Sequence, residues 1–265
     1  MRYLTGLIFE YQPRCNLATE HRWCPSWSRL KHSPPPGTGA THLTTDKIVE
    51  LTLLAREFGF DGLVGFHYYN EPMLEWNRLL GIMARLEEQS PPFRFILWTN
   101  GTYIRPDMAK DLARFEVVVV TNHTGLDLGM IWAMCPGVEL VLSTPDDRLT
   151  ARVDSPLDDR TSPCLRPMTE FVIDYWGEVH LCCYDWRAQS GIGNVLTDDP
   201  ADCITRWQQA RDAIVTAWTI GDLPEACRHC THRDYTLQSY CSVAGWRAIQ
   251  YTDRLRSDAL RAVHA

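Results

Sequence analysis

Short apolar runs alternate with helix patterns through the first 145 residues, and this alternation constrains the fold more than any other feature of the chain. The runs are typical of strands and cover residues 4–10, 62–67, 93–98, 116–121 and 138–143. Residues 45–58, 73–88 and 106–115 lie between them and space their apolar side chains as helices do. Strands and helices that alternate in this way form βα units around a parallel sheet. The sequence therefore predicts an α/β fold, with an incomplete parallel (β/α) barrel over residues 1–150.

The pattern changes after residue 150. Residues 171–185 predict two strands joined at Trp176 and Gly177, which is an antiparallel hairpin and not another βα unit. Helix patterns follow at 201–218 and from about residue 237 to the C-terminus. We therefore expect two domains, 1–150 and 151–265, of which the second is a small cysteine-rich module.

Composition narrows the classes of protein to which the chain can belong. With 45% hydrophobic and 22% charged residues, the chain can bury a core and is far from the composition of disordered proteins. It contains no run of 18 apolar residues and does not begin with a signal-peptide pattern, so we expect a cytoplasmic protein with no membrane partner. The net charge of −7 argues against a general nucleic-acid binder, because phosphate affinity needs an excess of Lys and Arg.

The chain has ten cysteines, and most of them fall in two groups. In a reducing compartment, clustered cysteines bind metal or perform redox chemistry more often than they form disulfides. Cys15 and Cys24 follow the first predicted strand. The second group lies in the second module and consists of Cys164, Cys182, Cys183, Cys227 and Cys230.

Polar residues follow the other predicted strands at the places where each of them ends. Ligands of parallel α/β sheets bind at this carboxyl edge. A carboxylate at a strand end also offers acceptors to an ammonium group. The candidate binding residues at this edge are Asn70, Glu71, Pro72, Thr99, Asn100, Thr121 and Asn122.

These motifs resemble the radical S-adenosylmethionine enzymes, in the branch with a C-terminal SPASM or twitch module. In that family, a C-x3-C-x2-C loop after the first strand holds a [4Fe-4S] cluster, whereas this chain has only Cys15 and Cys24 there. If Cys24 is the last ligand, His21 stands at the x2 position, and histidine replaces thiolate at some iron–sulfur centres. In the other alignment Trp27 falls at the third position, where it cannot ligate, and the cluster is degenerate or lost.

The resemblance also implies roles for the strand-end residues. The Asn70-Glu71-Pro72 segment is similar to the family's Gly-Gly-Glu-Pro turn, which holds the amino group of the cofactor, although both glycines are replaced here. Thr99 and Asn100 are similar to the family's strand-end Thr-Asn-Gly turn. The resemblance places Thr121 and Asn122 near the ribose hydroxyls.

The second module resembles the SPASM and twitch modules in its spacing. Cys164 is followed by Gly177, four residues and Cys182, and the pair Cys227 and Cys230 comes later. These four thiolates would hold one auxiliary cluster. Cys183 is an alternative to Cys182, and a structural zinc site with the same four thiolates is an alternative to the cluster.

The function that the resemblance implies is that of a radical S-adenosylmethionine enzyme. Such an enzyme cleaves S-adenosylmethionine to methionine and a 5′-deoxyadenosyl radical, which modifies a substrate. We expect two [4Fe-4S] clusters, an electron donor, and a peptide or protein as substrate, with a small molecule as the alternative. A protein of another class, which binds an iron–sulfur cluster or zinc and has lost radical chemistry, is the competing hypothesis.

Overall fold

The computed structural model describes most of the first half of the chain and parts of the second. The described residues are 1, 4–19, 24, 41–134, 140–143, 167, 170–183, 185, 188, 190–220 and 227. The predicted helix after residue 237 lies outside them.

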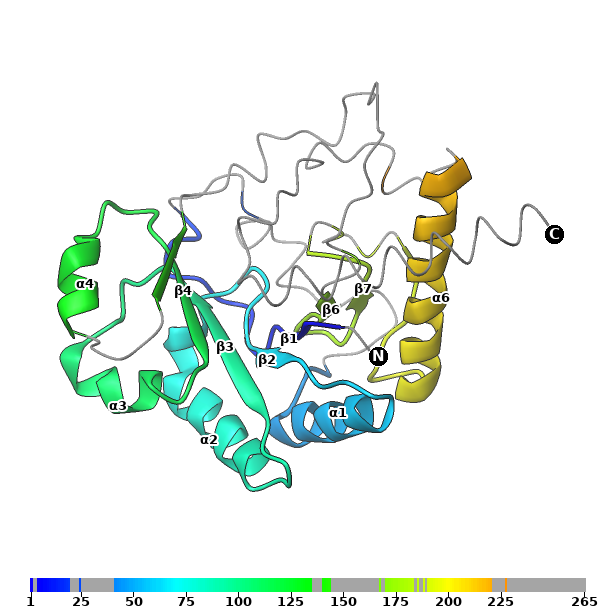
Figure 1. Ribbon diagram of the computed structural model, residues 1–265, viewed down its shortest axis with the longest axis horizontal. Coiled ribbons are helices and arrows are strands. Elements are labelled where there is room, and N and C mark those ends of the chain that lie inside the picture. The colour runs from blue at the N-terminus through cyan, green and yellow to red at the C-terminus, as the bar shows by residue number, and fades with distance from the viewer. Residues whose placement is uncertain are drawn as a thin grey trace.

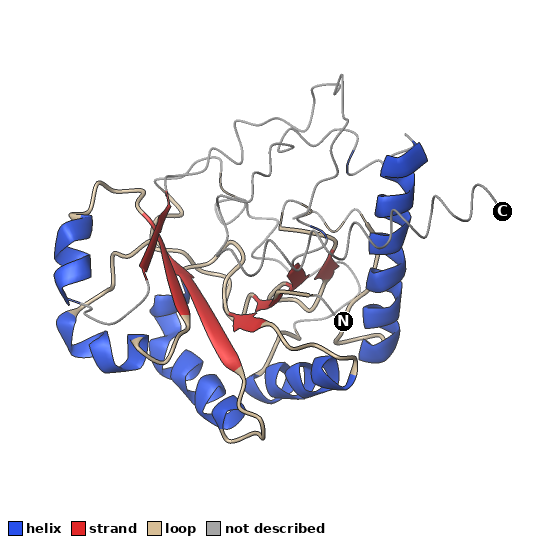
Figure 2. Ribbon diagram, in the orientation of Figure 1, coloured by secondary structure: helices blue, strands red, loops and turns tan. Residues whose placement is uncertain are grey.

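The described part is a mixed α/β structure with a seven-stranded sheet in the order β5-β4-β3-β2-β1-β6-β7 (Figures 1 and 2). Neighbouring strands are parallel except for β6 and β7, which are antiparallel. The parallel strands agree with the α/β fold that the sequence predicts, and the antiparallel pair β6–β7 extends the sheet at one edge. The strands are β1 (Gly6–Phe9), β2 (Leu63–Gly65), β3 (Arg94–Thr99), β4 (Val117–Thr121), β5 (Leu140–Ser143), β6 (Glu170–Ile173) and β7 (Val179–His180).

The predicted helices that fall within the described residues are present, with two differences. The segments after β2 and β3 each begin as a 3-10 helix with Pro at its first turn before the α-helix starts. A short helix after β4 was not predicted, because it has too few residues to show a period. The helices are α1 (Thr45–Glu57), η3 (Pro72–Glu75), α2 (Trp76–Glu87), η4 (Pro106–Met108), α3 (Ala109–Leu112), α4 (Leu128–Met134) and α6 (Pro200–Ile220).

Two apolar layers cover the two faces of the sheet, as the alternation along each strand requires. Leu7, Val64 and Leu97 belong to the main core, to which residues of α1 and α2 also contribute. Ile8 and Ile96 belong to smaller clusters separate from the main core. In Figure 1, α6 stands beside β7 at one end of the sheet, and α3 and α4 lie near β4 at the other.

The sheet continues beyond residue 150, which the sequence did not reveal. The predicted hairpin is confirmed, because β6 pairs with β7 in an antiparallel manner. However, β6 also pairs with β1 along its whole length in parallel register, from Gly6 opposite Glu170 to Phe9 opposite Ile173. The hairpin therefore shares a sheet with the N-terminal strands. The domain boundary near residue 150 stays a prediction.

Gly177 shapes the turn of this hairpin. Its φ is +83°, and a Cβ atom there would lie 2.6 Å from Leu196 Cγ and 2.7 Å from Asn194 Oδ1. The Asn194 side chain donates to the carbonyl of Trp176 and to Glu178 Oε1, both at 2.9 Å. The segment around Asn194 is thus docked on the hairpin turn, and only glycine leaves room for it.

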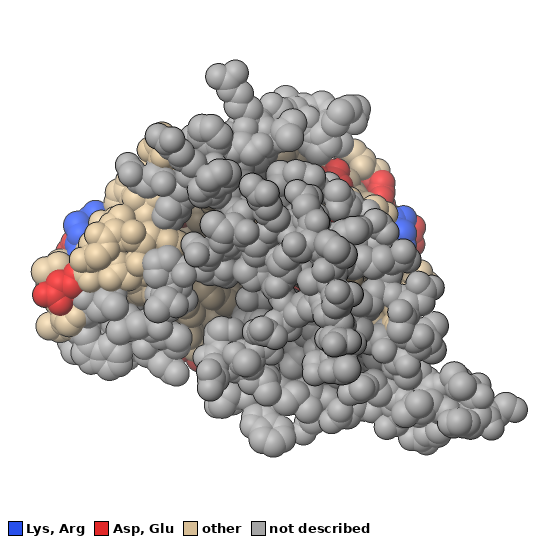
Figure 3. Space-filling view, turned by 90° about the horizontal axis from the view of Figure 1, so that it is seen from above, with Lys and Arg blue, Asp and Glu red and all other residues tan. Residues whose placement is uncertain are grey.

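No helix among the described residues is long and apolar enough to cross a membrane. The described charged side chains visible in Figure 3 lie at its left and right margins, with both signs side by side. The negative net charge therefore does not collect into a single described patch on this face.

We predict that Gly177→Ala destabilises the protein by about 2–4 kcal/mol, which is the sum of about 1 for a left-handed backbone and about 1–3 for overpacking. Gly191→Ala is the matched control, because Gly191 also has a positive φ of 59° but a Cβ there meets no described atom within 4 Å. Urea denaturation measures both variants. Equal losses in the two would show that the close approach to Asn194 and Leu196 has no energetic weight.

Candidate functional site

The carboxyl ends of β1, β2 and β3 meet at one edge of the sheet, and their following loops contact one another there. In a parallel sheet all strands end at the same edge, so residues distant in sequence become neighbours. Three loops contribute: residues 10–19 after β1, 66–72 after β2 and 100–103 after β3. The candidate site is built from these loops.

Glu71 lies at the centre of this edge and is 1% exposed. Its Oε1 accepts a hydrogen bond from Thr99 Oγ1 at 2.7 Å and another from the Met73 amide at 3.1 Å. Its Oε2 accepts from the Asn100 amide at 2.8 Å. The carboxylate therefore caps η3 on its own loop and at the same time fixes the end of β3.

Burial raises the pKa of Glu71, because a charged carboxylate loses its hydration there. The hydrogen bonds from Asn100, Thr99 and Met73 oppose this rise, since they favour the ionised form. Ionised Glu71 would be strongly destabilising in this buried position if those three hydrogen-bond donors were removed. The geometry of the three loops is thus tied to one side chain.

The backbone of Glu71 holds the loop after β1. Its amide donates to the carbonyl of Arg14 at 2.9 Å. Its carbonyl accepts from Gln12 Nε2 at 2.7 Å, and the same amide group of Gln12 also donates to the Arg14 carbonyl at 2.8 Å. These bonds place the start of the predicted cluster loop directly against Glu71.

Three further polar side chains join the loops after β1 and β3. Asn100 Nδ2 donates to Asn16 Oδ1 at 2.8 Å, and Asn16 Nδ2 donates to Thr102 Oγ1 at 2.9 Å. Thr102 Oγ1 in turn donates to Asn100 Oδ1 at 2.6 Å. The residue next to Cys15 is therefore held in a closed ring of hydrogen bonds.

Cys15 is partly buried at this edge, as is Cys24. Burial raises the pKa of the Cys15 thiol to about 11, and the negative charges of Glu71 and Cys24 add to the rise, while a backbone hydrogen bond involving Leu17 and one with Asn100 lower it. The thiol is therefore protonated at neutral pH. A metal that binds Cys15 must displace this proton.

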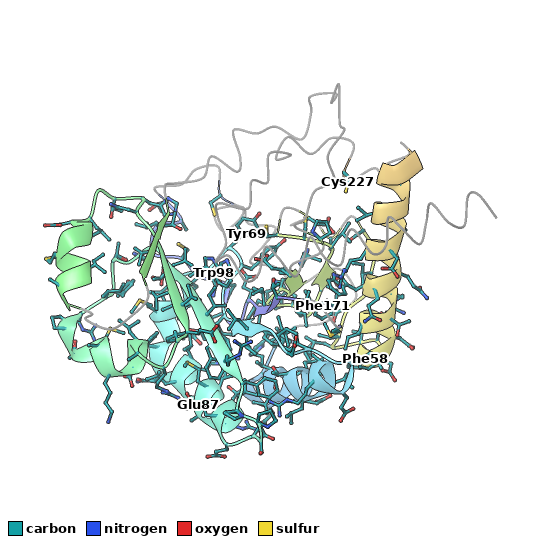
Figure 4. The ribbon with its side chains drawn as sticks, viewed as in Figure 1. Phe58, Tyr69, Glu87, Trp98, Phe171 and Cys227 are labelled. Atoms are coloured by element: carbon teal, nitrogen blue, oxygen red, sulfur yellow. The ribbon has the colours of Figure 1, made fainter. Side chains whose placement is uncertain are left out.

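An aromatic layer connects this edge to the second cysteine group. Tyr69 donates its hydroxyl to the Cys183 carbonyl at 2.6 Å, and its amide donates to Glu10 Oε1 at 3.2 Å. Figure 4 shows Tyr69 and Trp98 near the middle of the described sheet, with Trp98 on β3. The layer consists of Ile8, Tyr68, Tyr69, Val172 and Cys183, with Cys24 and Trp98 packed against it.

His180 supports the turn that carries Cys182 and Cys183. Its Nδ1 lies 2.6 Å from the Asp185 carbonyl and its Nε2 lies 3.2 Å from Asp174 Oδ2. Burial alone would lower the pKa of His180, but the hydrogen bond and charge of Asp174, together with Asp185, outweigh it and raise the pKa. The sequence does not single out His180, because a histidine inside an apolar strand belongs to no recognisable motif.

Other predicted binding residues lie at the same edge with partners of their own. Asn70 Oδ1 accepts from the Tyr68 amide at 2.8 Å. Asn122 donates to the Leu126 carbonyl at 2.9 Å and accepts from its amide at 2.8 Å. Pro72 is the first residue of η3, and Thr121 ends β4. Their roles toward a cofactor stay predictions.

The structure describes four of the seven predicted metal ligands. Cys182 and Cys227 are partly buried, and Cys227 packs against the main core (Figure 4). His21, Cys164 and Cys230 lie outside the described residues. Within the described part of the chain, no group of three or more His, Cys, Asp or Glu side chains is placed to hold a metal ion.

Comparison with known proteins identifies the second cysteine group. Residues 164–231 match the SPASM family, which is an iron–sulfur cluster-binding domain. The matched segment contains Cys164, Cys182, Cys227 and Cys230. No curated protein matches the chain.

Two solved structures share the fold. BtrN in complex with AdoMet and 2-DOIA superposes with a TM-score of 0.62 at 19% identity, over 86% of this chain and 92% of that chain. Selenomethionine BtrN in an open conformation gives a TM-score of 0.51 at 18% identity, over 90% of this chain and 92% of that chain. The SPASM match and this fold support the resemblance to the SPASM branch of the radical S-adenosylmethionine enzymes.

We predict that Glu71→Gln lowers the free energy of unfolding by about 1–3 kcal/mol. Each carboxylate oxygen accepts from a backbone N–H, so the new NH2 group faces a donor whichever position it takes. Glu116→Gln is the control, since Glu116 forms an exposed ion pair with Arg94 and should change stability by less than about 0.5 kcal/mol. Urea denaturation of the metal-free proteins measures both. An unchanged free energy of unfolding in Glu71→Gln would contradict the conclusion that this carboxylate holds the three loops together.

Proposed function

We propose that this chain is a radical S-adenosylmethionine enzyme with two [4Fe-4S] clusters. The first cluster is held by Cys15, His21 and Cys24 and binds S-adenosylmethionine. The auxiliary cluster is held by the four SPASM thiolates of Cys164, Cys182, Cys227 and Cys230. The observation that carries the proposal is the SPASM match in a chain whose Cys15, Cys24 and Glu71 share the carboxyl edge of a BtrN-like fold.

The described residues fit an iron–sulfur centre at this edge. Cys15 and Cys24 are near enough for their charges to interact, and thiolates are the usual ligands of such clusters. The buried layer that contains Tyr68 and Tyr69 packs against Cys24 and Trp98. Such surroundings keep water away from a reactive centre.

When bound, the cluster and S-adenosylmethionine supply reductive cleavage to methionine and a 5′-deoxyadenosyl radical. The chain's own residues bind and orient the cofactor. Glu71 Oε2 accepts one hydrogen bond from the protein and, as an ionised carboxylate, has capacity for a further donor such as the cofactor's ammonium group. Asn70 and Pro72 contribute backbone carbonyls beside it, and Thr99 and Asn100 hold the carboxylate in place. Thr121 and Asn122 face the ribose hydroxyls in this proposal.

The proposal includes a peptide or protein substrate, an electron donor and a cytoplasmic location. Relatives with a SPASM module often modify peptides, and a reducing compartment keeps the cysteines available for iron. A small-molecule substrate is the second candidate, and the structure of BtrN in complex with AdoMet and 2-DOIA favours it.

The competing function is that of a cluster-binding or zinc-binding protein without radical chemistry. The observation that favours it is the missing third cysteine between Cys15 and Cys24. A structural zinc site formed by the four thiolates of residues 164–231 would function without S-adenosylmethionine bound near Glu71.

Metal analysis of anaerobically reconstituted protein separates these functions. We expect about eight iron and eight sulfide per chain, which corresponds to two [4Fe-4S] clusters. Cys15→Ala and Cys182→Ala should each remove about four of both. Cys203→Ala is the control, because Cys203 is buried, packs in the main core and contacts Arg206, and it should keep the full content. Zinc without sulfide would refute the proposal and support the binding protein.

A further prediction concerns His21. If it is the third ligand, His21→Ala should lose the first cluster, and His21→Cys should keep or strengthen it, since thiolate is the usual ligand. Electron paramagnetic resonance of the reduced protein, with and without S-adenosylmethionine, measures this in a Cys182→Ala background. A signal and a cofactor-induced shift that are unchanged in His21→Ala would exclude this histidine as a ligand, and strengthening by Trp27→Cys would support the other alignment.

A further inference from the structure

Arg78 on α2 joins two points of the chain that are distant in sequence. Its NH1 donates to the Tyr11 carbonyl at 2.7 Å, and its NH2 donates to the Leu43 carbonyl at 2.6 Å. Tyr11 lies where the chain leaves β1, and Leu43 lies just before α1. The segment between them contains Cys15, His21 and Cys24.

The two carbonyls are held in a way that only arginine provides. The guanidinium is planar and presents several N–H groups in a fixed fork, whereas a lysine ammonium is a point charge on a flexible stem. The side chain of Arg78 is 24% exposed, and its guanidinium lies over the Tyr11 ring at 5.4 Å. Glu75 Oε2, at 3.4 Å, accepts from the same NH1.

Further contacts fix the same two points. The Leu43 amide donates to the Tyr175 carbonyl at 3.0 Å, and the His42 ring stacks on the Tyr175 ring at 4.9 Å. The Tyr11 hydroxyl donates to the carbonyl of Pro72. Tyr11 is therefore bonded to η3, the 3-10 helix that Glu71 caps, while Leu43 is bonded to α2 and to Tyr175.

Arg78 is rigidly related to Glu71, because η3 runs directly into α2. Residues 71–78 thus carry both the buried carboxylate of Glu71 and the guanidinium of Arg78. This guanidinium binds the carbonyls of Tyr11 and Leu43. We propose that Arg78 is a positioning residue that sets Cys15 relative to Glu71. This inference rests on the proposed function of the edge.

Arg78→Met and Arg78→Lys test the proposal against Arg85→Met. Arg85 lies on the same helix, is 45% exposed and pairs with the exposed Asp46, so its loss should leave the edge unchanged. Hydrogen exchange of the metal-free proteins is the first measurement. We expect the amides of Leu43 and Arg14 to exchange about tenfold faster in both Arg78 variants, since a hydrogen bond to a charged donor is lost.

Electron paramagnetic resonance is the second measurement, again in the Cys182→Ala background. Both Arg78 variants should lose most of the S-adenosylmethionine-induced shift, and lysine should not rescue it, because the ammonium cannot bridge two carbonyls. Circular dichroism and the iron content of the auxiliary cluster, measured with Cys182 intact, show that the variants are folded.

The outcomes distinguish a failure of the positioning role of Arg78 from a failure of the proposed function. Normal exchange and a normal cofactor-induced shift in Arg78→Met would overturn the positioning role. If the parent protein itself shows no cofactor-induced shift, the proposed function fails, and faster exchange at Leu43 and Arg14 would still establish that Arg78 fastens the segment. Full rescue by Arg78→Lys would show that charge alone suffices and would contradict the fork geometry.

Discussion

The hydrogen bonds of one buried carboxylate hold the candidate site together. Glu71 accepts from Met73, Thr99 and Asn100, and its backbone bonds to the loop after β1. Such a group is stable in the interior only while its donors remain, since an unpaired buried charge is far more costly than a paired one. The ends of β1, β2 and β3 therefore depend on one another, and the edge is formed as a unit. The proposed binding site is therefore held in place by the chain's own hydrogen bonds.

A second constraint is the pairing of β6 with β1, which brings the SPASM residues to the same sheet as the predicted cluster loop. Glu10 strengthens this junction, because its carboxylate accepts from the amides of Tyr69 and Tyr175 on either side of β1. The aromatic layer then packs Cys24 of the first group and Cys183 of the second against the same side chains. One cysteine of each group, Cys24 and Cys183, thus belongs to the same packed layer, although they are 159 positions apart in sequence (183 − 24).

Local patterns predicted much of this structure. Each of the first five strands follows from an apolar run of its own, and the hairpin at Gly177 follows from a turn glycine between two such runs. The strand-end motif also pointed to Glu71, Thr99 and Asn100. The pairing of β6 with β1 was not predictable, because neither strand carries a signal for its neighbour. The contacts of Arg78 and His180 were hidden for the same reason, since a charged residue on a helix and a histidine in a strand look ordinary until the chain folds.

The account links the Glu71 edge to the chemistry of S-adenosylmethionine, and product analysis tests that link most directly. Reconstituted protein would be reduced with dithionite and incubated with S-adenosylmethionine, and the products would be quantified by liquid chromatography with mass spectrometry. The account predicts 5′-deoxyadenosine and methionine in equal amounts, formed by the parent protein and not by Cys15→Ala. Protein that carries its full iron and sulfide yet leaves S-adenosylmethionine intact would contradict it.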